Sequence, residues 1–134
     1  MPPRIFMTAA EVSGDQHAAA LIRSLRAIRP DVIVEGLGGQ AMRDAGATIH
    51  HDTVTRAAMG WRAIFRAMEF RRLLKWTDQH YAQNRIDLHI CIDSSGVNFH
   101  FARLARRHGA KVLYYIAPQV WASREGRIKT MQQC

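Results

Sequence analysis

"RIFMTAAEVSGDQHAAALIRSLRAI", residues 4–28, decides the fold class. Residues 4–10 form a short apolar run typical of a buried strand, and "EVSGD" (11–15) has the composition of a turn. Residues 16–28 then repeat apolar side chains at helical spacing, and Pro30 stops the helix. The predicted apolar stripe consists of Ala18, Leu21, Ile22, Leu25 and Ile28. A strand, a glycine-containing turn and an amphipathic helix together predict the first unit of an α/β fold.

The same alternation continues along the chain. Further strands are expected at 32–39, 86–93 and 111–117, with a short extra strand at 48–51. Helices are expected at 41–45, 59–83 and 98–109, the last ended by Gly109. Strands and helices that alternate through short links predict a parallel sheet with helices on both faces. Residues 1–134 are therefore expected to form a single Rossmann-like domain.

Composition narrows the class of partner. A content of 48% hydrophobic and 22% charged residues is that of a globular chain, and 19 Lys and Arg against 11 acids give a net charge of +8. This excess favours a phosphate-rich partner, either nucleic acid or an anionic membrane surface. No known nucleic-acid motif occurs, so we expect no nucleic-acid partner. Two cysteines make no disulfide framework, and no uncharged run of about 18 apolar residues occurs to span a bilayer.

Three unusual loops follow predicted strands, at the edge where α/β sheets bind ligands. "EVSGD" (11–15) opens a helix whose free N–H groups attract an anionic ligand, whereas simple capping by Ser13 or Asp15 needs no ligand. Glu11 directly follows the strand. "GLGGQA" (36–41) matches G-x-G-x-x-A but follows the second strand, with no acid about 20 residues later. A tight turn at Gly38 and Gly39, close to a ligand, is therefore favoured over a dinucleotide site, and no cofactor is expected.

The third loop, "DSSGVN" (93–98), begins with an acid at the tip of an apolar strand. Asp93 is either a cap or turn residue or a catalytic base. Asn98 either hydrogen-bonds a substrate, orients the carboxylate or caps the next helix. The seven histidines show no ligand-pair spacing, so no metal site is expected.

The segment "MGWRAIFRAMEFRRLLK" (59–75) is apolar on one helical side and basic beside it. One interpretation is an amphipathic helix that packs on the sheet. The other is an interfacial segment whose apolar residues enter lipid while arginines meet phosphate headgroups. The predicted contact residues are Met59, Trp61, Arg62, Ile64, Phe65, Arg66 and Met68.

Five blocks, in order across nearly the whole chain, resemble the lipid-A-disaccharide synthase family: "AAEVSGD" (9–15), "GLGGQAM" (36–42), "AAMG" (57–60), "IDSSGVN" (92–98) and "YIAPQVWASR" (115–124). The resemblance implies a two-domain GT-B glycosyltransferase on the inner membrane's cytoplasmic side. It implies transfer of 2,3-diacylglucosamine from UDP to 2,3-diacylglucosamine 1-phosphate, with a β-1,6 linkage and release of UDP. It makes Asp93 the base and implies substrate contacts at Glu11, Ser13, Gly14, Asp15, Gly38, Gly39 and Asn98.

This chain departs from the family pattern. Ala10 replaces a glycine, Ser95–Val97 replace Pro-Asp-Phe, and Ser123 replaces a tryptophan. The family is also more than twice as long, so the chain is expected to be the N-terminal, acceptor-side half, without the nucleotide-sugar half. The alternative is a non-catalytic Rossmann-like domain that binds an acidic lipid or a nucleotide. Assembly into a homo-oligomer stays open.

Overall fold

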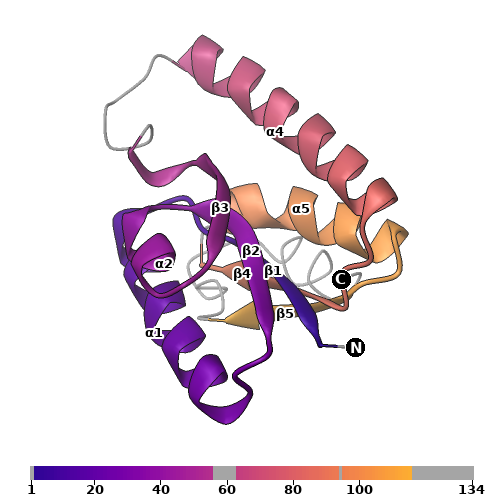
Figure 1. Cartoon of the computed structure of the whole chain (residues 1–134). Coiled ribbons are helices and arrows are strands. Elements are labelled where there is room, and N and C mark those ends of the chain that lie inside the picture. Colours follow the sequence, from indigo (N-terminus) through magenta and orange to yellow (C-terminus); the bar gives the residue numbers. More distant parts are fainter. Residues whose placement is uncertain (1, 56–62, 94, 116–134) are drawn as a thin grey trace, which may run out of the picture.

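The computed structural model describes residues 2–55, 63–93 and 95–115 and contains a five-stranded, wholly parallel sheet (Figure 1). The strand order is β3-β2-β1-β4-β5. The strands are β1 (Arg4–Thr8), β2 (Ile33–Gly38), β3 (Thr48–Asp52), β4 (Leu88–Ile92) and β5 (Lys111–Tyr115). The described part of the chain therefore has the Rossmann-like α/β fold that the sequence predicts, and the short strand expected at 48–51 is real.

Helices cover both faces of the sheet. One core cluster joins α1 (Val12–Ile28) and α2 (Gln40–Asp44) to the sheet, and a second joins α4 (Ala63–Gln83) and α5 (Ser95–Arg107) to the opposite face. Neighbouring residues of β1 show the division: Phe6 belongs to the α4/α5 cluster and Met7 to the α1/α2 cluster, both with 0% exposure. Because both faces are buried, the three successive central residues of β1, Ile5, Phe6 and Met7, are all apolar rather than alternating with polar ones.

Two helices begin earlier in the chain than the sequence predicts. Helix α1 begins at Val12 rather than residue 16, and α5 begins at Ser95 rather than residue 98, so both glycine-containing "turns" are first helical turns. Ile28, the last residue of the predicted apolar stripe and of α1, is 83% exposed, so the stripe is not buried at this end. The end of α4 at Gln83 is confirmed, as is the role of Gly109, which has a φ of 86° just after α5. Residues 59–62 and 116–117 lie outside the described residues.

Gly36 is required where β2 meets β1. A Cβ at this position would lie 1.9 Å from the carbonyl oxygen of Met7, a backbone atom of the neighbouring strand. The register of β2 against β3 also shifts between Gly36 and Leu37. Glycine thus permits a close backbone approach in the middle of the sheet.

The chain reverses its winding between β1 and β4. Just past their last paired residues, the Ala9 amide donates to the Leu37 carbonyl, towards β2, whereas the Asp93 amide donates to the Tyr115 carbonyl, towards β5. The two strands therefore separate at their carboxyl ends. This is the topological switch point, where α/β sheets of this kind bind ligands.

Candidate functional site at the switch point

Asp93 lies at the switch point, directly after β4. It is the one non-glycine residue with positive φ among those the structure describes, at 49°. Aspartate tolerates this left-handed conformation because its side chain is short and polar. Its carboxylate is half-buried and, within residues 2–55, 63–93 and 95–115, has no hydrogen-bonding or ionic partner. An uncommitted carboxylate is thus held at the edge where a ligand is expected.

The side chain of Asn98 holds the backbone on which Asp93 stands. Asn98 is 1% exposed, and its Nδ2 donates to the carbonyl of Ile92 at 3.1 Å and to that of Asp93 at 2.6 Å. Consecutive carbonyls of an extended strand point in opposite directions, so the positive φ of Asp93 is what lets one amide reach both. The amide is therefore used internally, and Asn98, the fourth residue of α5, is not a helix cap.

The first loop supplies two exposed polar residues to the same edge. Glu11 is the N-cap residue of α1, with no hydrogen bond from its side chain to the helix, and Ser13 is exposed in the first turn. Gly14 is buried: a Cβ there would lie 3.5 Å from the Ile92 side chain and 3.6 Å from that of Ala9. Gly14 therefore packs the start of α1 against the ends of β1 and β4.

Asp15 caps a helix, but not its own. Its carboxylate accepts hydrogen bonds from the backbone N–H groups of Gly39 (3.0 Å), Ala41 (3.1 Å) and Met42 (3.1 Å) at the start of α2. Asp15 is 5% exposed and occupies the place that an anion would take at a helix N-terminus. The ligand that the "GLGGQ" backbone approaches is thus this internal carboxylate.

Both glycines of that turn are explained by contacts within the protein. A Cβ on Gly39 would lie 2.6 Å from Oδ2 of Asp15, and one on Gly38 would lie 2.2 Å from Sδ of Met42. The carbonyl of Gly38 accepts a hydrogen bond from the Thr53 amide at 3.0 Å. Any contact of Gly38, Gly39 or Asp15 with a substrate stays a prediction.

A buried row of polar side chains lies beneath Asp93, and sequence patterns did not indicate it. Thr8, His89 and Asn98 are 2%, 0% and 1% exposed, and Tyr81 of α4 is 5% exposed. Nε2 of His89 lies 3.0 Å from Oγ1 of Thr8, and its Nδ1 lies 2.6 Å from the Tyr81 hydroxyl. Burial lowers the pKa of His89 to about 3, so the ring is neutral at pH 7. Burial likewise raises the pKa of Tyr81.

The neutral His89 predicts a loss of stability in acid. The unfolded chain binds a proton near the ordinary pKa of 6.5, whereas the folded chain does so only near 3. The free energy of unfolding should therefore fall as pH drops from 6.5 towards 3, by on the order of 3 kcal/mol for this group at pH 4.5. Urea denaturation at pH 7.5 and 4.5 measures it. His89→Gln, which keeps a donor towards Thr8, should lose this part of the pH dependence, and an unchanged dependence would contradict the neutral ring.

A second polar cluster joins α4 to the sheet. Ligand atoms of Glu35, His50 and His80 all lie within 4.8 Å of one another, the spacing of a cation site. Oε1 of Glu35 accepts hydrogen bonds from Nε2 of His80 and from Nε2 of His50, the latter at 3.0 Å. Its other oxygen, Oε2, lies 2.5 Å from Nε of Arg4. Burial raises the pKa of Glu35, but the hydrogen bonds from Arg4, His50 and His80 outweigh it and hold that pKa below its usual value. Because Arg4 neutralises the carboxylate and would repel a metal ion, ion pairing explains this cluster.

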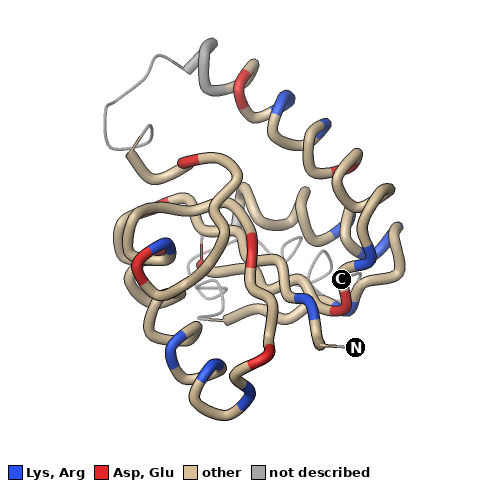
Figure 2. The backbone as a smooth tube through the Cα atoms, in the orientation of Figure 1, with Lys and Arg blue, Asp and Glu red and all other residues tan. Residues whose placement is uncertain are grey.

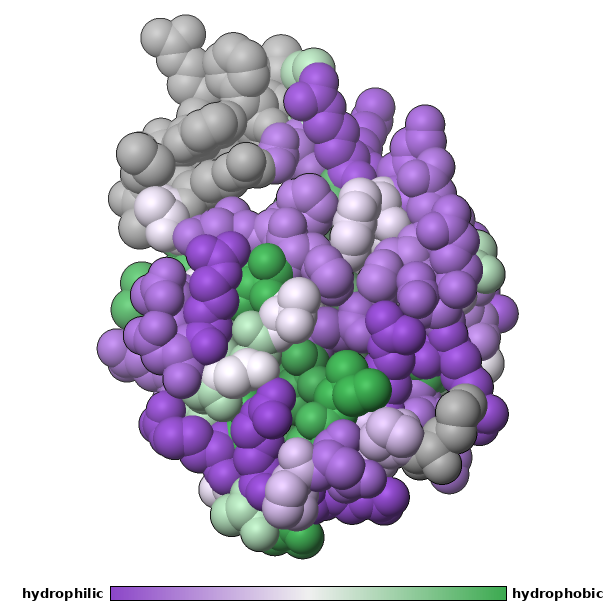
Figure 3. Space-filling model, viewed as in Figure 1, coloured by the Kyte–Doolittle hydropathy of each residue, from purple (hydrophilic) through white to green (hydrophobic). Residues whose placement is uncertain are grey.

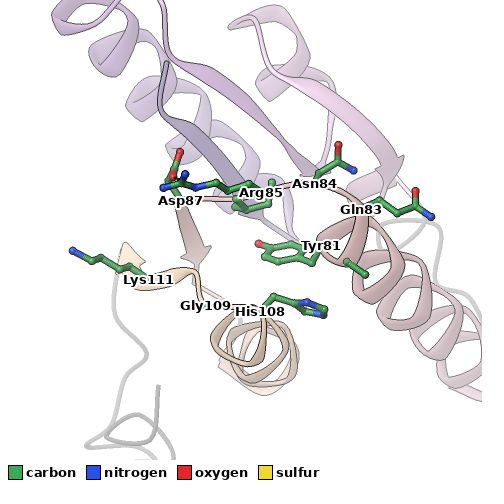
Figure 4. Close-up of a pocket in the computed structure, with 10 residues that line it drawn as sticks. Tyr81, Gln83, Asn84, Arg85, Asp87, His108, Gly109 and Lys111 are labelled. Atoms are coloured by element: carbon green, nitrogen blue, oxygen red, sulfur yellow. Dashed lines mark ion pairs between the residues drawn. The ribbon is translucent and has the colours of Figure 1, made fainter. Parts of the chain in front are cut away.

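A pocket of about 660 Å³ lies away from the switch point (Figure 4). Its walls include Asp87, just before β4, and Lys111, the first residue of β5, so it is at the amino ends of these strands. Arg85 pairs with Asp87 at 3.3 Å. The pocket therefore lies at the opposite edge of the sheet from Asp93.

The predicted membrane segment lies mostly outside the described side chains. The structure does not describe Met59, Trp61 and Arg62. It describes only the backbone, as part of helix α4, for Ile64, Phe65 and Arg66. Met68, the last of the predicted contact residues, is 52% exposed. Figure 2 shows Lys and Arg along both helical layers, and Figure 3 shows mainly hydrophilic residues over the described part of α4. Among the described residues, no helix is both long and apolar enough to cross a bilayer.

Comparison with known proteins agrees with the sequence motifs. Residues 5–134 match the sequence model of a family described as lipid-A-disaccharide synthetase. A lipid-A-disaccharide synthase of Geobacter sulfurreducens is 42% identical over 129 residues, which are 96% of this chain and 34% of that protein. Lipid-A-disaccharide synthase 1 of Legionella pneumophila is 35% identical over 133 residues, 98% of this chain and 35% of that protein. The chain thus spans about a third of the length of these relatives.

A solved structure supports the fold. A crystal structure described as the glycotransferase of kitacinnamycin superposes with a TM-score of 0.58 at 17% identity, over 99% of this chain and 36% of that one. At this identity the likeness concerns the fold alone, which is the Rossmann-like α/β arrangement described above. Since the family match spans residues 5–134 and is supported by relatives at 35–42% identity, the chain belongs to the lipid-A-disaccharide synthetase family.

Proposed function

We propose that this chain is the acceptor-side half of a lipid-A-disaccharide synthase. The reaction joins the 6-hydroxyl of 2,3-diacylglucosamine 1-phosphate to the anomeric carbon of UDP-2,3-diacylglucosamine and releases UDP. A sugar hydroxyl is a weak nucleophile at neutral pH, so the attack needs a base within hydrogen-bonding reach. UDP is an acceptable leaving group, so a single base on this half suffices for inversion at the anomeric carbon.

The observation that carries the proposal is the contrast between Asp93 and other acids of the sheet and its adjoining turns. Asp15 accepts three backbone N–H groups, and Glu35 is held by Arg4 and two imidazoles. Asp52 accepts from the Val54 amide and from the amide and hydroxyl of Thr55. Asp93 alone combines a rigid position at the end of a central strand with a carboxylate that has no such partner in the described structure. It is the acid best suited to accept a proton from a substrate.

The neighbouring loop supplies the other proposed contacts. Glu11 and Ser13, exposed at the start of α1, are proposed to bind polar groups of the acceptor sugar. The buried Asp15, Gly14, Gly38, Gly39 and Asn98 are proposed to act by positioning this edge, because each already contacts the protein. The proposal needs no cofactor or metal ion, because the base takes the hydroxyl proton and UDP leaves as the new glycosidic bond forms.

The test is a transfer assay with a full-length protein that carries this chain. Incubation with both lipid substrates should form the β-1,6 disaccharide and release UDP in equal amounts. Residues 1–134 alone should give negligible transfer, because holding both substrates in line supplies much of the rate. Binding of the acceptor lipid without any transfer by the full-length protein would favour the non-catalytic alternative instead.

The substrates are membrane lipids, so the proposal extends to binding at the inner membrane's cytoplasmic surface. We propose that the 59–68 segment enters the interface, with Trp61 and Phe65 in the acyl region and Arg62 and Arg66 at the phosphates. The double change Trp61→Ser, Phe65→Ser should weaken sedimentation with anionic vesicles, by up to a few kcal/mol of binding free energy.

The control for that prediction changes apolar residues elsewhere. Ile28 and Ile33 are 83% and 43% exposed, on α1 and β2. The double change Ile28→Ser, Ile33→Ser removes two exposed apolar side chains outside that segment and should leave vesicle binding unchanged. Equal loss in both double variants, or misfolding of the first as judged by circular dichroism, would contradict an interfacial role for the 59–68 segment.

A further inference from the structure

The hydrogen bonds beneath Asp93 have a single consistent direction. Nδ2 of Asn98 faces two carbonyls, so this end of the amide must donate and Oδ1 must accept. Oδ1 contacts the hydroxyl of Thr8, which therefore donates its one proton to Asn98. The same hydroxyl oxygen lies 3.0 Å from Nε2 of His89 and can only accept there. Nε2 of His89 must then carry the ring proton.

The other end of the row completes the assignment. With its proton on Nε2, the neutral ring of His89 offers Nδ1 as an acceptor, and the Tyr81 hydroxyl, 2.6 Å away, donates to it. Every donor from Tyr81 to Asn98 thus points towards the carbonyls of Ile92 and Asp93. All four side chains are at most 5% exposed, so water does not replace a lost partner easily.

We infer that Thr8 and His89 are positioning residues that act through Asn98 to fix the backbone of Asp93. The row connects α4, β4, β1 and α5, so it determines where α5 sits relative to the split between the two central strands. The Asn98 amide reaches both carbonyls only while Asp93 keeps its positive φ, and Thr8 orients that amide. Holding the backbone of Asp93 fixes the point from which its side chain starts and so limits the positions that the carboxylate can take, as the placement of a general base requires.

The functional consequence rests on the proposed role of Asp93 as base. Thr8→Val, which replaces the hydroxyl with a methyl group of similar size, should lower kcat roughly 10-fold to 10²-fold, the cost of a small misplacement of a reacting group. The KM for the acceptor should change little, because no residue of the row faces the crevice. Thr8→Ser keeps the hydroxyl and should restore most of kcat.

Thr77 offers a matched control. It is a threonine with 0% exposure whose hydroxyl donates to the Leu73 carbonyl within α4, outside the row. Thr77→Val should cost comparable stability but leave kcat unchanged when both variants are assayed well below their melting temperatures. An equal fall of kcat in Thr77→Val and Thr8→Val would overturn the inference, since it would mark a general effect of destabilisation.

Nuclear magnetic resonance separates this inference from the proposed function. In the wild type, the ¹⁵N shifts of His89 should report the Nε2–H tautomer, and the backbone shifts and coupling of Asp93 should report positive φ. Thr8→Val should alter the Asp93 signals and Thr77→Val should not. Unaltered Asp93 signals in Thr8→Val, or the Nδ1–H tautomer in the wild type, would overturn the inference. Altered signals with an Asp93→Asn variant that remains active would support the positioning row and refute only the base.

Discussion

Asp93→Asn should retain the fold and lose roughly 10²-fold or more in turnover, the scale of general-base catalysis. Asparagine is the conformationally matched replacement, because it accepts the positive φ of this position at least as readily as aspartate does. The change removes the proton acceptor and little else, since the Asn98 amide contacts the backbone of Asp93 and not its carboxylate. Turnover of both lipid substrates by the full-length protein measures the effect.

Two further variants show whether the loss of turnover is specific to Asp93. Glu11→Gln tests the exposed acid before α1 at this edge and should raise the KM for the acceptor more than it lowers kcat. Asp44→Asn, an exposed acid at the end of α2, should leave both constants unchanged. Near-normal turnover of Asp93→Asn would assign the base to another residue, and a large loss in Glu11→Gln alone would point to Glu11.

Gly36→Ala should destabilise the protein by on the order of 3 kcal/mol or more, a large part of the stability of a domain this size. The added methyl carbon would have to lie 1.9 Å from the Met7 carbonyl oxygen, so β1 and β2 must separate. A flexible side chain in the same place would rotate away, but a carbonyl within a paired strand cannot. Urea denaturation and the yield of folded protein measure the loss.

Gly96→Ala is the matched control for that prediction. Gly96 is exposed in the first turn of α5, and a Cβ there meets nothing within 4 Å. The change should be neutral or stabilising by up to about 1 kcal/mol, because alanine favours helix more than glycine does. A Gly36→Ala variant as stable as Gly96→Ala would show that β2 does not approach β1 as closely as described.

The layer order of the fold was predictable because each strand and helix has its own local pattern. Strands buried on both faces are short apolar runs, and α1 repeats apolar residues at helical spacing. The starts of α1 and α5 were mistaken because Ser, Gly and Asp also favour turns. In the structure, the cap of one helix comes from another, as Asp15 caps α2. No pattern local to residues 11–15 contains that information.

The candidate site was predictable only in part for a related reason. Asp93 was noticeable because a charged residue ended an apolar strand, and the family motif drew attention to Asn98. Thr8 and His89 stand within strands that otherwise look like ordinary core, and their pairing requires the strand order. Likewise, His50 and His80 are far apart in the sequence, and only the packing of α4 on the sheet brings both to Glu35.

The row of hydrogen bonds joins residues that are far apart in the sequence, and this separation bears on the order of folding. The contacts between Asp15 and α2 join residues 24 to 27 positions apart, so the unit from β1 to β3 closes through short loops. Thr8 meets His89 and Asn98 across 81 and 90 positions, and closing such long loops is slower. We therefore expect a chain that folds from its N-terminal unit first, with the geometry around Asp93 acquired last, when β4 and α5 dock beside β1.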